Sequence, residues 1–86
     1  MNKKIKRPDK LILYANGIRV FSQVISAFEY VSLSKFFKQN TDTTAEQFYD
    51  FCNVKNISLK LDYYFFLAMF KPGVVFKAEL KRYEPI

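Results

Sequence analysis

The sequence predicts an α+β domain in which three helices precede a C-terminal two-stranded β-hairpin. Up to Asn56 the polar residues recur at spacings of three and four, which is typical of amphipathic helices, whereas beyond Asn56 apolar and polar residues alternate. The third observation is Pro72-Gly73, a strong turn signal between two alternating runs. We therefore expect a single domain over residues 11–86, preceded by a basic arm over residues 1–10.

The first helix is expected over residues 18–33. Its polar positions lie three and four residues apart at Arg19, Ser22, Gln23, Ser26, Glu29 and Ser32. Apolar residues fill the opposite face, and Asn16 is available as the N-cap. The β-branched residues of this stretch also suit a strand. Residues 11–14, in front of it, suit either a short strand or the opening of a helix.

Two further helices are expected before Asn56. Residues 34–39 begin with a capping residue and stop at the turn formers Asn40-Thr41-Asp42, so they predict a brief second helix. Thr44 stands three residues before Gln47, which is the spacing of a capping box. This spacing predicts a third helix over residues 45–53.

The hairpin is expected over residues 57–83, with its turn at Pro72-Gly73. Between residues 63 and 70 both faces of the first strand become apolar. A monomer can cover only one of them, so the other is expected to meet a second subunit. The candidate dimer residues are Tyr64, Phe66 and Phe70. A helix over residues 58–70 is the alternative, and it would remove the hairpin.

This order of elements resembles the winged helix-turn-helix domain over roughly residues 17–83. The resemblance is one of layout. It implies that residues 45–53 form a recognition helix, that the hairpin forms a wing, and that the protein binds double-stranded DNA as a homodimer. The recognition helix departs from the family pattern because its outer face offers Glu46 and Asp50 and no cation.

DNA contact is therefore expected mainly from the wing and the basic arm. The candidate contact residues are Lys3, Lys4, Lys6 and Arg7 in the arm, Thr43, Thr44 and Gln47 at the third helix, and Lys60, Lys71, Lys77, Lys81 and Arg82 in the wing. The charge distribution supports this assignment, because the net charge of +6 is concentrated at the two ends of the chain. A composition that is 50% hydrophobic and 19% aromatic favours a homodimer, since a small domain has little core in which to bury so many apolar side chains.

The composition also indicates what the protein is not expected to be. It contains no histidine, which is the commonest general base and metal ligand, so we expect no enzyme, metal, cofactor or small-molecule substrate. The single cysteine, Cys52, lies on the apolar side of the third helix and reads as a core residue. One cysteine favours a reducing compartment, and we expect the cytoplasm. No apolar run approaches the roughly 18 to 20 residues that span a bilayer.

The expected function is sequence-specific binding of double-stranded DNA by a small regulator, or by an accessory protein of a plasmid or mobile element at a transfer or replication origin. The alternative is a protein-interaction module or inhibitor encoded by a mobile element, docking through its aromatic-rich hairpin. A peripheral membrane protein that uses the arm and the first helix is a further alternative. It is disfavoured because the polar face of that helix carries little cationic charge.

Overall fold

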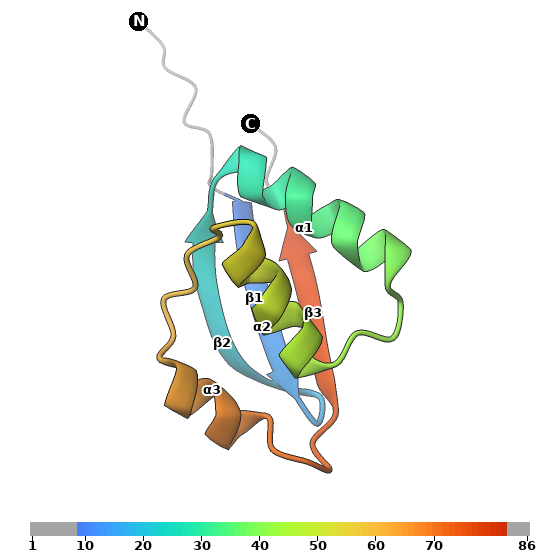
Figure 1. The fold of residues 1–86 in the computed structure, drawn as a ribbon, viewed down its shortest axis with the longest axis vertical. Coiled ribbons are helices and arrows are strands. Elements are labelled where there is room, and N and C mark those ends of the chain that lie inside the picture. The colour runs from blue at the N-terminus through green and yellow to red at the C-terminus, as the bar shows by residue number, and fades with distance from the viewer. Residues whose placement is uncertain (1–8, 83–86) are drawn as a thin grey trace, which may run out of the picture.

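The computed structural model describes residues 9–82 as a two-layer α+β fold, with a three-stranded antiparallel sheet and three helices (Figure 1). The elements are β1 (Asp9–Ala15), β2 (Ile18–Ile25), α1 (Ala27–Gln39), α2 (Ala45–Val54), α3 (Tyr63–Met69) and β3 (Phe76–Lys81). β1 is central, with β2 and β3 on either side. The predicted winged helix-turn-helix fold is therefore wrong, because two strands precede the helices and, within residues 9–82, a single strand follows them.

The first predicted helix, over residues 18–33, is wrong in its N-terminal half, where the chain forms β2. Asn16 and Gly17 have φ angles of 52° and 82°, the left-handed values that a two-residue hairpin turn needs at both central positions. Asn16 therefore turns the chain between β1 and β2 instead of capping a helix. The register between these strands shifts once, between Leu13 and Tyr14.

Gln23 explains why the polar spacing of β2 imitates a helix. Although polar, it points towards the helices and is only 8% exposed. Its side-chain amide donates a hydrogen bond to the carbonyl oxygen of Ser58 at 2.9 Å, and its Oε1 accepts one from the N–H of Lys60 at 2.8 Å. Gln23 thus holds the extended segment before α3 in place. That segment alternates like a strand, yet it has no strand partner.

α1 begins after Ser26 and runs unbroken to Gln39, so the predicted separate helix over residues 34–39 is wrong. The Ser26 Oγ accepts from the Glu29 N–H at 3.1 Å, and the Glu29 Oε1 accepts from the Ser26 N–H at 2.8 Å. This reciprocal pair is a capping box, and it satisfies two backbone donors that the first turn would otherwise leave unpaired.

The helix predicted over residues 45–53 is confirmed as α2. The Thr44 side chain accepts from the Gln47 N–H, and the Gln47 side chain accepts from the Thr44 N–H, both at 3.1 Å. Phe48 and Cys52, one turn apart, are buried on the predicted apolar side.

The predicted hairpin over residues 57–83 is wrong because its first half contains α3. The Asp62 Oδ2 accepts from the Tyr64 N–H at 3.0 Å and caps this helix. The turn at Pro72-Gly73 does form: Gly73 has a φ of 94°, and the Lys71 carbonyl accepts from the Val74 N–H at 3.1 Å. It joins α3 to β3, and β3 pairs with β1 instead of with residues 57–70.

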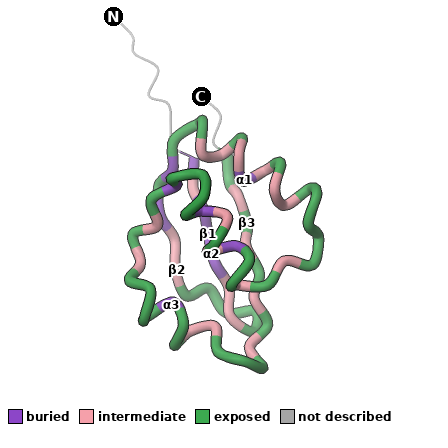
Figure 2. Tube along the Cα trace, viewed as in Figure 1, coloured by how far each residue is buried: buried purple, intermediate pink, exposed green. Residues whose placement is uncertain are grey.

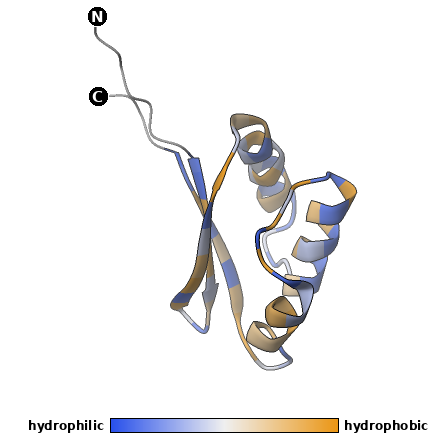
Figure 3. Ribbon diagram, turned by 90° about the vertical axis from the view of Figure 1, so that its left-hand side faces the viewer, coloured by the Kyte–Doolittle hydropathy of each residue, from blue (hydrophilic) through white to orange (hydrophobic). Residues whose placement is uncertain are grey.

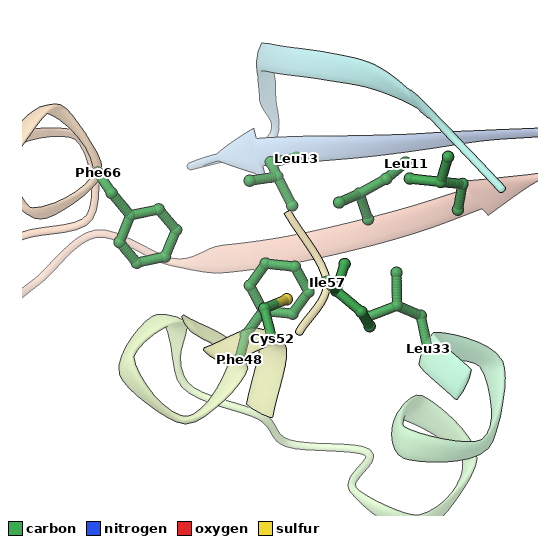
Figure 4. Close-up of a cluster of buried hydrophobic side chains, with 8 residues drawn as sticks. Leu11, Leu13, Leu33, Phe48, Cys52, Ile57 and Phe66 are labelled. Carbon is green, nitrogen blue, oxygen red and sulfur yellow. The ribbon is translucent and has the colours of Figure 1, made fainter. Parts of the chain in front are cut away.

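The core lies between the two layers and draws on every element of the fold. Figure 2 shows the buried positions along β1 and on the inner sides of the helices. The buried core residues are Leu11, Leu13, Ile25, Leu33, Phe48, Cys52, Ile57 and Phe66. In the close-up of Figure 4, Phe48 and Cys52 from α2 and Leu33 from α1 point towards Leu11 and Leu13 on the sheet. The helices therefore cover one face of the sheet only.

Candidate nucleic-acid interface

The other face of the sheet is free of helices, as the side view in Figure 3 shows. Leu11 and Leu13 point into the core, so Lys10, Ile12 and Tyr14 point to the opposite side of β1. Their directly paired residues on β2 and β3 share that side. The three cross-strand rows are Val24–Lys10–Lys81, Ser22–Ile12–Glu79 and Arg19–Tyr14–Lys77. We call these residues the open face.

The open face holds the whole charge excess of the described chain. Residues 9–82 carry ten Lys and Arg against seven Asp and Glu, an excess of three positive charges. The open face has four cations and one carboxylate, which is also an excess of three. The cations are Lys10, Arg19, Lys77 and Lys81, and the carboxylate is Glu79. The remaining described surface is therefore neutral overall, and a polyanion would be attracted to the sheet.

Glu79 and Tyr14 are joined across the open face. The Tyr14 hydroxyl donates to the Glu79 Oε1 at 2.7 Å, and this hydrogen bond is the main cause that raises the pKa of Tyr14 above its ordinary value of 10.0. The bond holds the tyrosine side chain on the central strand near the turn end of the sheet, in the same row as the cations Arg19 and Lys77. Tyr14 therefore stays protonated near neutral pH, and its hydroxyl holds the Glu79 carboxylate in one orientation.

Of the predicted contact residues within residues 9–82, two lie on the open face: Lys77 and Lys81, both on β3. Lys60 lies on the segment before α3, and Lys71 lies at the turn after it. Lys10 and Arg19 complete the cationic set, and neither was predicted as a contact residue. The helical pattern over residues 18–33 predicts Arg19 on the polar face of a helix. The missed signal was Asn16-Gly17, a dipeptide typical of the turn that joins two paired strands.

Arg82 takes part in holding the fold together. Its guanidinium donates to the Asp9 Oδ2 at 3.1 Å, and its Cζ lies 4.1 Å from the centre of the Tyr30 ring. Asp9 is 7% exposed, so this ion pair neutralises a buried carboxylate. The predicted arm residues Lys3, Lys4, Lys6 and Arg7 lie outside the described residues.

The three predicted contact residues at the third helix are engaged within the helical layer. Thr44 and Gln47 form the capping box of α2, and the Thr43 hydroxyl donates to the Asn40 carbonyl at 2.7 Å. Thr43 and Thr44 also line a cleft of about 610 Å³ between α2, α3 and the turn after α3. Thr43 also lines a second concave site together with Lys77 and Ala78 of β3. Thr44 and Gln47 cap α2, which packs on the other face of the sheet.

Aromatic rings and carboxylates both line this cleft. Its aromatic lining includes Tyr49, Phe66, Phe70 and Phe76, and the carboxylates of Glu46 and Asp50 also line it. Neither cysteine nor histidine lines it. Within residues 9–82, no group of three or more His, Cys, Asp and Glu side chains is placed to hold a metal ion.

The three predicted dimer residues separate in the structure. Phe66 is 1% exposed and packs against Tyr49 and Phe70, so its ring is not available to a partner subunit. Phe70 is half-buried and contacts the ring of Phe76. Only Tyr64, at 78% exposed, faces outwards. The three residues differ in exposure because residues 63–69 form a helix, which presents one residue in every three or four to the core.

Cys52 provides a direct test of core packing. Burial raises the pKa of its thiol to about 12 from the ordinary value of 9.0, and the nearby charge of Glu29 adds to the effect. At pH 8 the native thiol should therefore react with iodoacetamide roughly 1,000-fold more slowly than in the urea-unfolded chain, because the thiolate is the nucleophile. Mass spectrometry reports the rate without ambiguity, since this is the sole cysteine. Equal rates in both states would contradict the buried position.

No protein-family model matches this chain, and no curated protein or solved structure is significantly similar to it. Within residues 9–82, no helix has both the length and the apolar character required to cross a bilayer.

Proposed function

We propose that this protein binds double-stranded DNA through the open face of its sheet. The observation that carries the proposal is the concentration of the charge excess on this face, which has two cations in each of its two end rows and a tyrosine on its central strand. Lys and Arg neutralise phosphates and release counterions, which supplies most of the affinity of non-specific DNA binding.

The dimensions of the sheet suit a duplex. Neighbouring strands lie about 4.8 Å apart, so the outer strands of a three-stranded sheet are separated by roughly 10 Å. The major groove of B-DNA is about 12 Å wide and admits β-ribbons as well as helices. With the strands running along the groove, Lys77 and Lys81 on β3 face one phosphate backbone, and Arg19 on β2 faces the other. Lys10 and Tyr14 on β1 then face the base edges.

A duplex-binding domain of this kind would act in the cytoplasm as a small regulator, or as an accessory protein at a transfer or replication origin. Both roles need binding without catalysis. A protein that instead docks on another protein would not need a cationic sheet.

The salt dependence of binding tests the proposal. The three phosphate contacts of Arg19, Lys77 and Lys81 predict that the logarithm of the affinity for a mixed-sequence duplex falls against the logarithm of the salt concentration with a slope of about −2.7. Fluorescence anisotropy with the full chain measures this slope, and a single-stranded oligonucleotide of the same length serves as the comparison. A slope near zero, or no binding to the duplex at low salt, would refute the proposal. Preference for the single strand would exclude the groove geometry.

A further inference from the structure

α3 is an unusual surface helix because its seven residues carry no charge. Most of it is exposed: Tyr64 by 78%, Phe65 by 67%, Tyr63 by 42% and Leu67 by 40%. A helix that is apolar on all sides is normally buried on all sides. Only Phe66 is buried here, which leaves an apolar outer surface at the opposite side of the fold from the open face.

We propose that this surface binds α3 of a second copy of the protein in an antiparallel, two-fold symmetric pair. The proposal is independent of DNA binding. The two-fold axis passes between Phe66 and Leu67 of each helix. Two residues that lie equally far from this point, one on each side of it, therefore meet across the interface. We call the interface formed in this way the α3 pair.

Charge complementarity selects a second copy as the occupant. Asp62 precedes α3 and Lys71 follows it, both are exposed, and neither forms an ion pair within residues 9–82. The antiparallel arrangement places Asp62 of each copy next to Lys71 of the partner subunit. Both ends of the apolar contact are thereby closed by opposite charges. A parallel arrangement would bring like charges together instead.

Shape complementarity points to the same arrangement. The two-fold axis that pairs Asp62 with Lys71 also places the Phe65 ring of each copy opposite Ala68 of the partner subunit. Ala68 is exposed and small, so it leaves room for the ring. The bulkiest exposed side chain at the centre of the helix therefore meets the smallest one.

The area available predicts a weak dimer. With about 200 Å² for each aromatic side chain, the exposed fractions of Tyr63, Tyr64, Phe65 and Leu67 amount to roughly 430 Å² per chain, or about 860 Å² for the pair. Specific interfaces begin near 1,000 Å², so we expect a dissociation constant on the order of 10–100 µM.

Sedimentation equilibrium of the full chain, without DNA, tests the α3 pair. We expect reversible dimerisation in the wild type and at least a tenfold weaker association in F65S. The matched control is F28S on α1, which replaces a phenylalanine of similar exposure, 72%, and should leave the dimer unchanged. Circular dichroism verifies that both variants fold. A wild type that is monomeric at the highest accessible concentration would overturn the proposal, as would an F28S variant that loses the dimer while F65S retains it.

A charge cycle tests the orientation. K71E should weaken the dimer, because it places two carboxylates together at each end. In a D62N background, K71E should raise the dissociation constant of the dimer by a smaller factor, since asparagine keeps the helix cap but removes the charge. If K71E raised the dissociation constant by the same factor in both backgrounds, the antiparallel arrangement would be refuted. Sedimentation of the wild type with anionic phospholipid vesicles provides the competing outcome: Phe65-dependent vesicle binding by a monomer would assign the surface to a membrane and overturn the dimer.

Discussion

Replacing Phe48 by alanine should lower the free energy of unfolding by about 3–5 kcal/mol, which is a large part of the roughly 5–15 kcal/mol typical of a whole domain. Phe48 is fully buried, and its ring lies 5.7 Å from that of Phe37 and 5.4 Å from that of Phe76, measured between ring centres. It therefore joins α2 to both α1 and β3. Removing it leaves a cavity where the two layers meet, and the surrounding rings can collapse into that space only in part.

Urea unfolding followed by circular dichroism measures this loss, and the midpoint should fall without a change in cooperativity. F28A is the control, because Phe28 is 72% exposed and its truncation should change stability by about 0.5 kcal/mol or less. A loss below about 1.5 kcal/mol for F48A would show that Phe48 does not join the layers as described.

The double substitution K77E/K81E should weaken duplex binding by roughly 100- to 1,000-fold at low salt, the largest functional effect that we expect. It changes the open face from three net positive charges to one net negative charge. Each lost contact between a cation and a phosphate is worth on the order of 1 kcal/mol, and each new carboxylate adds repulsion of similar size.

The matched control is K35E/K38E on α1. Lys35 and Lys38 are exposed cations of the helical layer, so this variant has the same total charge as K77E/K81E. Anisotropy titrations of both variants with one duplex separate a localised interface from a general charge effect. An equal loss of affinity in the two variants would show that the open face has no special role. An unaffected K77E/K81E variant would remove β3 from the interface.

The sequence predicted those elements whose local signals agree with one another. α2 was predicted within one residue because its capping box, its helical period and its preceding turn all indicate the same helix. The turn at Pro72-Gly73 follows from the backbone preferences of two residues and needs no tertiary contact. The alternating run after Pro72-Gly73 correctly predicted a strand, although the structure pairs this strand, β3, with β1.

The remaining errors come from residues whose role depends on distant contacts. Gln23 breaks the two-residue alternation of β2 because its amide binds a segment 35 residues away, so the local pattern imitates a helix. Residues 63–70 are apolar without a period, and the distinction between strand and helix depends there on Asp62 as a cap. The open face could not be predicted because it requires β1 to pair with β3, a contact between the two ends of the chain.

The position of β1 between β2 and β3 has a consequence for biosynthesis. β1 and its neighbour β2 leave the ribosome together and can form a hairpin at once, but the second side of β1 must wait for the last strand, as the 65-residue separation of Tyr14 and Glu79 illustrates. During most of translation β1 therefore exposes unpaired backbone groups along one edge. Such closure between distant segments slows folding relative to a helical bundle of equal length. Nascent chains that stall before Phe76 should thus be the species most prone to aggregate or to recruit chaperones.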